Sequence, residues 1–482
     1  MACVTPIRRL EGRDVTTLEG LSEDRRTLWA RALVATGGSQ CGFCTPGIVM
    51  RLAALEGDEH GGADRVDQAL LAHLCRCTGW RSITEAAALV LDGAPGSGAV
   101  PPTRDLAGAA ARAGVEGGVS QRVGPAVVLG DAGFADDSAP PGSLVAVVDG
   151  DGYAVAATLG AARALAGKVQ GRSTTVPLGR PVPPPEGVWA VTLATTWVEP
   201  AYVEPDASWC VPGGTPASPY GNGGSFGGKL RSPVAADARR LADEHGRPVR
   251  VLWSREDVVR RGPKRPPVGG GVLQDGTGVL CVGVTDGTVG GQEWDEVVAK
   301  VAAVAPGLVL RQVPVVGPPV SLDLRAAVWA EAAVLAAAAR SGRPGVALVD
   351  VPVEVVAPSG GRAVVRCTAD GSLDVEVHAG RVLDAVVLRS YALGAAHQAL
   401  GWVRSEGIAV APDGVVQDLT VRSFGILQSR AMPVVTVHAV DDPSAPPVNG
   451  SEAVFAAVAA ARWLADGLPP VWPTDRAAAG RR

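Results

Sequence analysis

The sequence has no block of basic residues and no uninterrupted apolar run long enough to cross a membrane. Its 44 lysines and arginines are outnumbered by 49 acidic residues, and the net charge of −5 argues against a nucleic-acid or anionic-membrane partner. The longest apolar stretch, residues 326–339, is interrupted by Glu331 and is too short to span a bilayer. The first residues lack the charged-then-apolar order of a signal peptide. We therefore expect a cytoplasmic protein without membrane or nucleic-acid partners.

Glycine and proline are abundant, which argues against an all-helical protein. The 62 glycines and 38 prolines imply many turns and much extended structure, and 482 residues are too many for one ordinary core. The Gly/Pro/Ser-rich stretch at residues 93–103 is the clearest domain boundary. We predict an α+β chain in which an all-helical unit precedes a mixed region. The predicted segments are 1–20, 21–92, a linker at 93–125, 126–312 and 313–482.

Helical and strand-like patterns separate on either side of that boundary. The first twenty residues have a strand-like pattern, and four short helices follow. Two of these helices start near the candidate caps Ser22 and Thr45, and the others cover about residues 66–74 and 83–91. Beyond the boundary, strands are expected at residues 126–129, 144–148, 249–253, 363–368 and 373–378. Helices are expected at residues 234–244, 326–340, 451–466 and from Tyr391 onward.

Four of the eight cysteines form two close pairs in the predicted helical unit. Cys41 and Cys44 form a C-x2-C pair at the start of the second helix, and Cys75 and Cys77 form a C-x-C pair at the end of the third. In a short antiparallel bundle those helix ends can lie together, so four thiolates would converge. Sulfur ligands suit zinc or an iron–sulfur cluster, and the tight C-x-C pair favours the cluster. Zinc and buried reduced thiols are the alternatives.

The residues around these cysteines resemble the second [2Fe-2S] domain of the molybdenum hydroxylases, which include xanthine dehydrogenases, aldehyde oxidases and aerobic carbon monoxide dehydrogenases. The resemblance lies in residues 38–47 (GSQCGFCTPG) and 74–79 (LCRCTG). It implies that the four cysteines hold one [2Fe-2S] cluster and that Gln40 and Cys77 lie against the pterin of a molybdenum cofactor. Residues 1–20, with Cys3, resemble the end of the family's ferredoxin-like domain, whose other three cysteines this chain lacks.

A glycine-rich segment, residues 220–229 (YGNGGSFGGK), is the second informative motif. A phosphate-binding loop would need Ser or Thr in place of Leu230 and a strand before the glycines. A loop without a ligand is another alternative, although glycines let backbone N–H groups approach a ligand closely. The segment resembles the GG-x-FGGK loop of the family's large subunit, which implies that it binds the molybdenum cofactor with Phe226 near the substrate. The implied cofactor-binding residues are Gly224, Ser225, Phe226, Gly227 and Gly228.

Two C-terminal segments extend the resemblance. Gln398 and Gly401 match the family's Gln-x2-Gly pattern, which lines the pterin. Residues 449–452 (NGSE) resemble a G-x-G-E motif whose glutamate is the catalytic base. Aligned on the acid, Glu452 is that base, but aligned on the glycine, Ser451 takes its position and Glu452 is rotated by about 100 degrees. A third interpretation makes Ser451 a helix cap with Glu452 stabilising the first turn.

The other single polar residues are assigned to packing. His397 stands next to Gln398, and we expect it to be packed or exposed rather than catalytic. The scattered Cys210, Cys281 and Cys367 are expected in the core. None of them contributes to the functional prediction.

The motifs together predict a molybdopterin-dependent oxidoreductase. The resemblance implies oxidation of a small-molecule substrate, an aldehyde or N-heterocycle, with electrons passing to the [2Fe-2S] cluster. No FAD domain is recognisable, so a separate FAD-containing subunit or another electron acceptor is expected, in a possible homo- or hetero-oligomer. Residues 126–383 are shorter than the corresponding region of the family. The alternative is therefore an incomplete or inactive iron–sulfur electron-transfer or cofactor-binding subunit.

Overall fold

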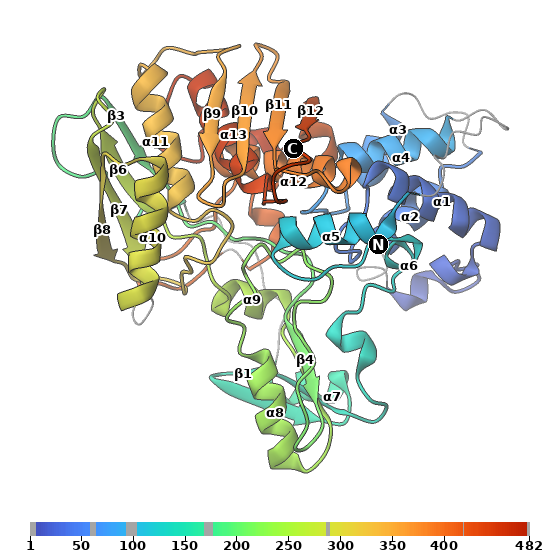
Figure 1. The fold of residues 1–482 in the computed structure, drawn as a ribbon. Helices are drawn as coiled ribbons and strands as arrows, with labels where there is room; N and C mark the ends of the chain where they lie inside the picture. Colours follow the sequence, from blue (N-terminus) through green and yellow to red (C-terminus); the bar gives the residue numbers. More distant parts are fainter. Residues whose placement is uncertain are drawn as a thin grey trace.

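The computed structural model of the chain has three parts. They are a helical N-terminal unit, a small lobe that contains one sheet, and a larger region with two further sheets (Figure 1). The predicted α+β class is confirmed, because helices alone form the N-terminal unit and three four-stranded sheets follow. The described residues are 6–57, 64–92, 104–167, 177–285, 290–417 and 419–479.

Four helices build the N-terminal unit, as predicted. α1 begins where Ser22 accepts a hydrogen bond from the Arg25 N–H, and it ends at Gly37 in the left-handed conformation. The cap of α2 is Cys44, and the predicted cap Thr45 is already the first helical residue. The helices are α1 (Glu23–Thr36), α2 (Thr45–Ala53), α3 (Arg65–Leu70) and α4 (Arg81–Leu91).

Three local predictions are wrong. Residues 6–20 contain the short 3-10 helices η2 (Ile7–Arg9) and η3 (Leu18–Gly20), since no strand in the described part of the chain pairs with them. The predicted linker contains α5 (Leu106–Gly117), which packs against the later helix α12 (Ala385–Arg404). The predicted strand at 126–129 is the helical turn α6 (Pro125–Val128), whose leading proline favours a first helical turn. Cys3 and residues 93–103 lie outside the described residues.

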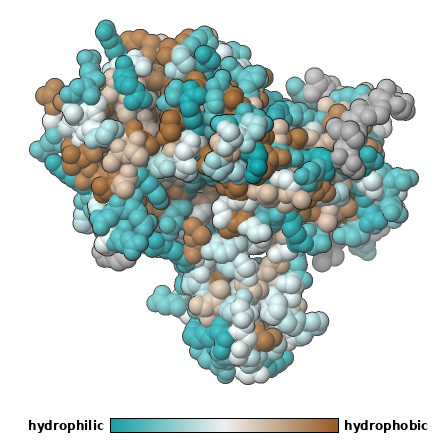
Figure 2. All heavy atoms as spheres, viewed as in Figure 1, coloured by the Kyte–Doolittle hydropathy of each residue, from teal (hydrophilic) through white to brown (hydrophobic). Residues whose placement is uncertain are grey.

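The small lobe is a four-stranded sheet covered by one helix on each face. Ala146 and Val148 pack against α8 (Val234–His245), whereas Val145 and Val147 pack against α7 (Leu159–Leu165), because successive strand residues point to opposite faces. The lobe projects from the rest of the molecule (Figure 2). Its strand order is β2 (Gly152–Ala156), β1 (Leu144–Asp149), β5 (Val249–Leu252) and β4 (Ala207–Cys210), with β1 and β5 parallel.

The second sheet crosses the domain boundary predicted near residue 312. Its last strand, β8 (Leu308–Pro314), pairs with the preceding β7 in parallel along its whole length, so residues on both sides of 312 belong to one sheet. α11 (Trp329–Ser341) packs on β6 and β3. The sheet order is β3 (Val191–Ala194), β6 (Val268–Val272), β7 (Gly278–Val284) and β8; α9 (Arg255–Arg261) and α10 (Gly291–Val304) complete this part.

The third sheet packs on the helices α12 (Ala385–Arg404) and α13 (Ser451–Ala465), which also pack on each other (Figure 1). Buried residues alternate along β11, as expected for a sheet with one covered face. Its strands, in order, are β12 (Val435–Val440), β11 (Leu373–His378), β10 (Arg362–Cys367) and β9 (Val353–Val356). Shorter 3-10 helices are η4 (Ala135–Ser138), η5 (Val421–Ser423), η6 (Ser429–Ala431) and η7 (Arg476–Ala479). Within the described ranges, no helix combines the length and apolarity needed to cross a membrane.

Candidate cofactor site between four cysteines and a glycine-rich loop

The four cysteines meet as two pairs. Cys41 and Cys44 precede and cap α2, while Cys75 and Cys77 lie in the loop between α3 and α4. The Sγ atoms of Cys41 and Cys77 are 3.6 Å apart, and Cys44 hydrogen-bonds Cys75. Two sulfurs bound about 2.3 Å from one tetrahedral metal would be about 3.8 Å apart, so each pair suits one metal ion. The pairing fits a cluster of two irons with two thiolates each.

Crowding of the thiols shifts their pKa values in opposite directions. A hydrogen bond from Cys44, aided by Thr78, lowers the pKa of Cys75 to about 6. The hydrogen bond to Cys75 and burial raise the pKa of Cys44, and the contact with Cys41 and burial raise that of Cys77. In the described residues, no three His, Cys, Asp or Glu side chains surround a single metal position. A one-ion zinc site needs such a group, so the geometry favours the two-metal cluster.

Glycines allow α12 to contact the C-x-C segment directly. A Cβ atom at Gly394 would collide with the carbonyl of Cys77, and one at Gly79 would collide with the carbonyl of Leu393. The Gln398 Nε2 atom donates to the Arg76 carbonyl at 3.1 Å. The cysteine loop is therefore fixed to the central helix of the C-terminal region.

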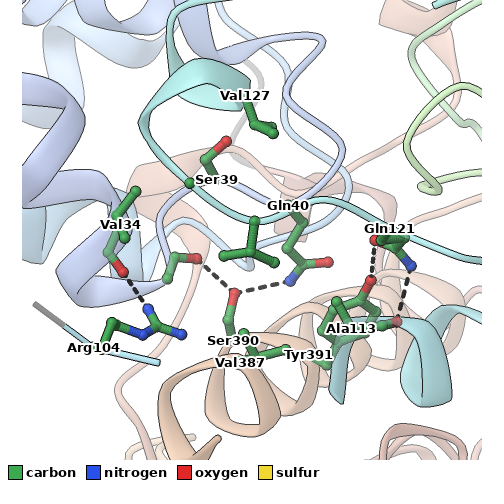
Figure 3. A pocket seen from close by; sticks show the side chains of 13 residues that line it. Val34, Ser39, Gln40, Arg104, Ala113, Gln121, Val127, Val387, Ser390 and Tyr391 are labelled. Atoms are coloured by element: carbon green, nitrogen blue, oxygen red, sulfur yellow. Dashed lines mark hydrogen bonds between the residues drawn. The ribbon is translucent and has the colours of Figure 1, made fainter. Parts of the chain in front are cut away.

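Gln40 adds a second link between the C-x-C segment and α12, and Figure 3 shows its hydrogen bond to Ser390. Its Nε2 atom donates to the Cys77 carbonyl and to the Ser390 Oγ atom, both at 2.9 Å. Beside it, the Tyr391 hydroxyl donates to Gln121 Oε1 at 2.7 Å. Gln40 and Tyr391 thus line both the small cavity of about 20 Å³ in Figure 3 and the larger cofactor cavity described below.

The glycine-rich loop touches the cysteine cluster. Gly224 has a φ of +76°, and a Cβ atom there would lie 2.8 Å from the Cys41 Cβ atom and 3.2 Å from the Sγ atoms of Cys41 and Cys77. Gly227, at φ +88°, leaves no room for a Cβ atom beside the Asp323 carbonyl. Phe226 lies between them at φ +52°, a strained conformation for a bulky residue. The loop conformation therefore requires glycine at the positions of closest approach.

Lys229 is a structural anchor of this loop. Its side chain is 1% exposed, and its Nζ atom donates to Glu204 Oε2 at 2.7 Å and to the Pro219 carbonyl at 2.9 Å. The lysine of a phosphate-binding loop must reach the phosphates. The buried ion pair therefore removes that alternative.

A cavity of about 210 Å³ lies between the loop, α12 and the start of α13, and we call it the cofactor cavity. The residues predicted from sequence that line it are Gln40, Gly224, Ser225, Phe226, Gly227 and Glu452. Gln398 instead lines an adjoining cavity of about 40 Å³, which shares Phe226 and Arg325 with the cofactor cavity. Gly228 packs against the Tyr202 ring and lines neither of them.

The start of α13 places Glu452 at the cofactor cavity. The Glu452 N–H donates to Asn449 Oδ1 at 3.0 Å, and the Ser451 N–H donates to the buried carboxylate of Glu116 at 2.9 Å. The cap residue is Gly450, so the interpretation of Ser451 as the helix cap is wrong. Burial raises the pKa of Glu452, an effect that Arg325 opposes.

Arg325 is a functional candidate that the sequence reasoning missed. Its guanidinium lies 5.0 Å from the Phe226 ring centroid and donates to Gln398 Oε1 at 3.3 Å and to Ser451 Oγ at 3.4 Å. No carboxylate among the described residues forms an ion pair with it, and burial lowers its pKa. A lone arginine in the otherwise apolar segment 324–330 was the available signal.

The expectations for the other single residues are confirmed. His397 is fully buried, and its Nε2 atom donates to the Leu427 carbonyl at 3.0 Å. Burial, with a contribution from Arg76, lowers its pKa to about 3, so the ring is neutral. Cys210, Cys281 and Cys367 are buried.

Comparison with known proteins matches the cysteine-containing unit by sequence and the whole chain by fold. Residues 17–88 match the family model of a [2Fe-2S] binding domain. The chain is 37% identical over 87 residues to a probable xanthine dehydrogenase subunit of Bacillus subtilis (18% of this chain, 50% of that protein). It is 44% identical over 88 residues to xanthine dehydrogenase of Emericella nidulans (18% and 6%). The aldehyde oxidoreductase of Desulfovibrio gigas has the same fold, with a TM-score of 0.69 at 13% identity, covering 99% of this chain and 93% of that one.

Residues 17–88 form a [2Fe-2S] binding domain similar to that of xanthine dehydrogenases, and the chain as a whole shares the fold of the aldehyde oxidoreductase. It spans half or less of the length of the two curated relatives named above. Sequence similarity to them is confined to the cysteine-containing unit, and likeness in the remaining residues is one of fold. The unit formed by residues 17–88 therefore binds a [2Fe-2S] cluster, and the four cysteines within it stay the predicted ligands.

Proposed function

We propose that the chain is an oxidoreductase that binds molybdopterin beside its [2Fe-2S] cluster and oxidises an aldehyde or an N-heterocycle. The observation that supports this most is the contact of Gly224 with Cys41 and Cys77, because it joins the cofactor cavity to the cluster sulfurs without an intervening side chain. Electrons released in the cavity would have a short path to the cluster. From there they would pass to a separate FAD-containing subunit or another acceptor.

The cavity residues fit a polar, flat cofactor. Gly224 and Gly227 leave backbone exposed where a side chain would collide, and Gln40 and Arg325 supply amide and guanidinium donors. Gln40, Ser225 and the glycines would hold the pterin, with the Cys77 backbone and Gln398 behind it; Gly228 would shape the loop by packing on Tyr202. When bound, the molybdenum cofactor supplies a metal centre that accepts two electrons from the substrate.

Two side chains of this chain would act on the substrate. Glu452 would be the general base: burial raises its pKa, which makes the carboxylate a stronger base, and its helix end is fixed through Asn449. The Phe226 ring, stacked with Arg325, would form an apolar wall against a flat substrate.

The test combines metal analysis with turnover. In Glu452→Gln the side chain keeps its shape, so molybdenum content should be unchanged while dye reduction falls by roughly 10²–10⁴, the range for loss of a general base. The matched control is Glu244→Gln, a change at an exposed helix position. Gly227→Val should remove molybdenum, because the valine would occupy the space beside Asp323. Wild-type protein without molybdenum after coexpression with cofactor-maturation enzymes would overturn the proposal.

A second candidate is an electron-transfer or cofactor-binding subunit without turnover. The observation in its favour is that the sequence similarity to the two curated relatives named above covers only the cluster-binding unit. Molybdenum-loaded wild-type protein that reduces no dye with any aldehyde or N-heterocycle would favour this candidate. Activity lost in Glu452→Gln alone would exclude it.

A further inference from the structure

A second large cavity, of about 250 Å³, opens between the small lobe and the C-x2-C segment, and we call it the acidic cavity. It shares no lining residue with the cofactor cavity. It borders the glycine-rich loop through Glu204, which lines it and binds Lys229. At about 30 Å³ per water molecule, it has room for a ligand the size of about eight waters.

Carboxylates dominate the polar lining of this cavity. Five acidic side chains line it against the single guanidinium of Arg163: Asp136, Asp137, Glu204, Asp206 and Asp257. Lys229 neutralises Glu204 at 2.7 Å and Arg250 neutralises Asp136 at 2.6 Å. Asp137 and Asp206 have no ion-pair partner among the described residues, so the cavity keeps an excess of negative charge.

Asp206 carries an unused acceptor in this lining. The residue is 1% exposed, and its Oδ2 atom accepts a hydrogen bond from the Tyr202 hydroxyl at 2.6 Å. Its Oδ1 atom is buried and has no hydrogen-bond partner. Buried polar atoms are almost always paired, and a buried carboxylate without a partner is costly. A cationic ligand in the cavity would supply a counter-charge to this carboxylate.

Aromatic rings form the other wall. Phe43 and Phe134 meet edge to face with ring centroids 5.3 Å apart, and Trp253 lies in the same lining. Aromatic faces attract organic cations and their apolar substituents. A bare metal ion would need several oxygen ligands around one point, and no such group exists in the described residues. The lining therefore suits a cation that also has an apolar surface.

We propose that the acidic cavity binds a compact organic cation, an ammonium group carried on a small apolar body. The ammonium group would lie against Asp206 and Asp137, and the apolar body would contact Phe43, Phe134 and Trp253. This site is independent of the proposed redox function, because none of its residues lines the cofactor cavity.

The test is calorimetric titration of the full-length protein with choline and with 3,3-dimethylbutan-1-ol, its uncharged isostere. Choline should bind at least about 30-fold more tightly, the factor that corresponds to a desolvated cation–aromatic contact. Asp206→Asn should weaken choline binding about tenfold and leave the isostere unaffected. Asp137→Asn, at a less buried position, provides the same test should Asp206→Asn fail to fold. Arg163→Gln should tighten choline binding, because it removes the positive charge of Arg163 from the lining.

The matched control is Asp131→Asn, an exposed aspartate nearby that does not line the cavity. Its choline affinity should equal that of wild type. Equal affinities for choline and the isostere would overturn the proposal, as would equal effects of Asp137→Asn and Asp131→Asn. Absence of binding by both choline and benzyltrimethylammonium at millimolar concentration would overturn it as well. None of these outcomes depends on molybdenum content, so the proposed function is tested separately.

Discussion

The helical N-terminal unit and the α12–α13 core are stabilised in different ways. In α1, 4 of 14 residues are buried, whereas in α12 the number is 16 of 20 and in α13 it is 13 of 15. The C-terminal helices are stabilised by the apolar surface that they bury. The shorter helices of the N-terminal unit bury fewer residues, and we expect this unit to depend also on bonds to metal and on contacts with the C-terminal region.

The contacts with α12, and with Glu406 just beyond its end, are polar and specific. Arg76, between the two cysteines of the C-x-C pair, forms a bidentate ion pair with Glu406 at 2.5 and 2.6 Å, and both side chains are almost fully buried. Gln398 binds the Arg76 carbonyl as well. These contacts attach the small cluster-binding unit to the more deeply buried α12–α13 core.

The sharpest test of this difference is removal of the cluster. Cys41→Ser should abolish the iron, about two per chain in wild type, together with the electron-paramagnetic signal after reduction. Helices between residues 21 and 92 should melt while the C-terminal core persists, because only the N-terminal unit depends on metal–thiolate bonds. Iron analysis and circular dichroism measure both effects, with Cys210→Ser, a buried cysteine of the small lobe, as control. Unchanged helicity after iron loss would show that the cluster does not stabilise the unit.

The second test breaks the ion pair between the two regions. Glu406→Gln should lower the free energy of unfolding by about 3–5 kcal/mol, because it leaves the buried charge of Arg76 without a partner. Glu354→Gln makes the same change in an exposed ion pair with Arg362 and should cost at most about 1 kcal/mol. Urea unfolding measures both. Equal losses of unfolding free energy in the two variants would mean that the buried ion pair does not stabilise the contact between the two regions.

The third test uses pH to weaken only the C-terminal core. The pKa of His397 is about 3 in the folded protein, because burial opposes its charge, against about 6.5 when unfolded. As the pH falls below about 6.5, the imidazole is protonated in the unfolded state but not in the folded state. The free energy of unfolding therefore decreases by about 1.4 kcal/mol per pH unit until the pH approaches 3.

Between pH 6.5 and 5 the contribution of His397 is about 2 kcal/mol. His397→Gln, which keeps a donor for the Leu427 carbonyl, should remove this part of the pH dependence. His438→Gln, at an exposed position, should leave it unchanged. Urea unfolding at the two pH values gives the slopes, and identical slopes for both variants would contradict the prediction.

The smallest effect is expected at Gln398. Gln398→Ala should cost about 1–2 kcal/mol, because the Arg76 carbonyl loses its donor in a buried environment. Gln292→Ala removes an amide from the exposed start of α10 and is the control. Thermal unfolding of the two variants measures the difference. A cost no larger than that of the control would mean that water replaces the amide.

Short-range patterns were sufficient for much of the fold. The four N-terminal helices, the strands β1, β5, β10 and β11, and the helices α8 and α13 were predicted within a few residues, because capping and apolar periodicity are local. The strand predicted at residues 126–129 failed because β-branched residues after a proline can start a helical turn when no strand lies alongside. The boundary near residue 312 failed because strand pairing in β8 is a long-range contact.

The sequence by itself was sufficient to predict the ligand set and the role of the loop. Two closely spaced cysteine pairs predict a metal site. The glycines at positions 224 and 227 indicate that the backbone of the loop closely approaches another group. Only the tertiary structure decided what the loop approaches, which residues share its cavity and which do not. The roles of Arg325 and Glu116 and the presence of the acidic cavity depend on packing between segments that lie hundreds of residues apart, so no local pattern predicts them. Burial then changes the properties of a charged side chain, because it opposes the charged form.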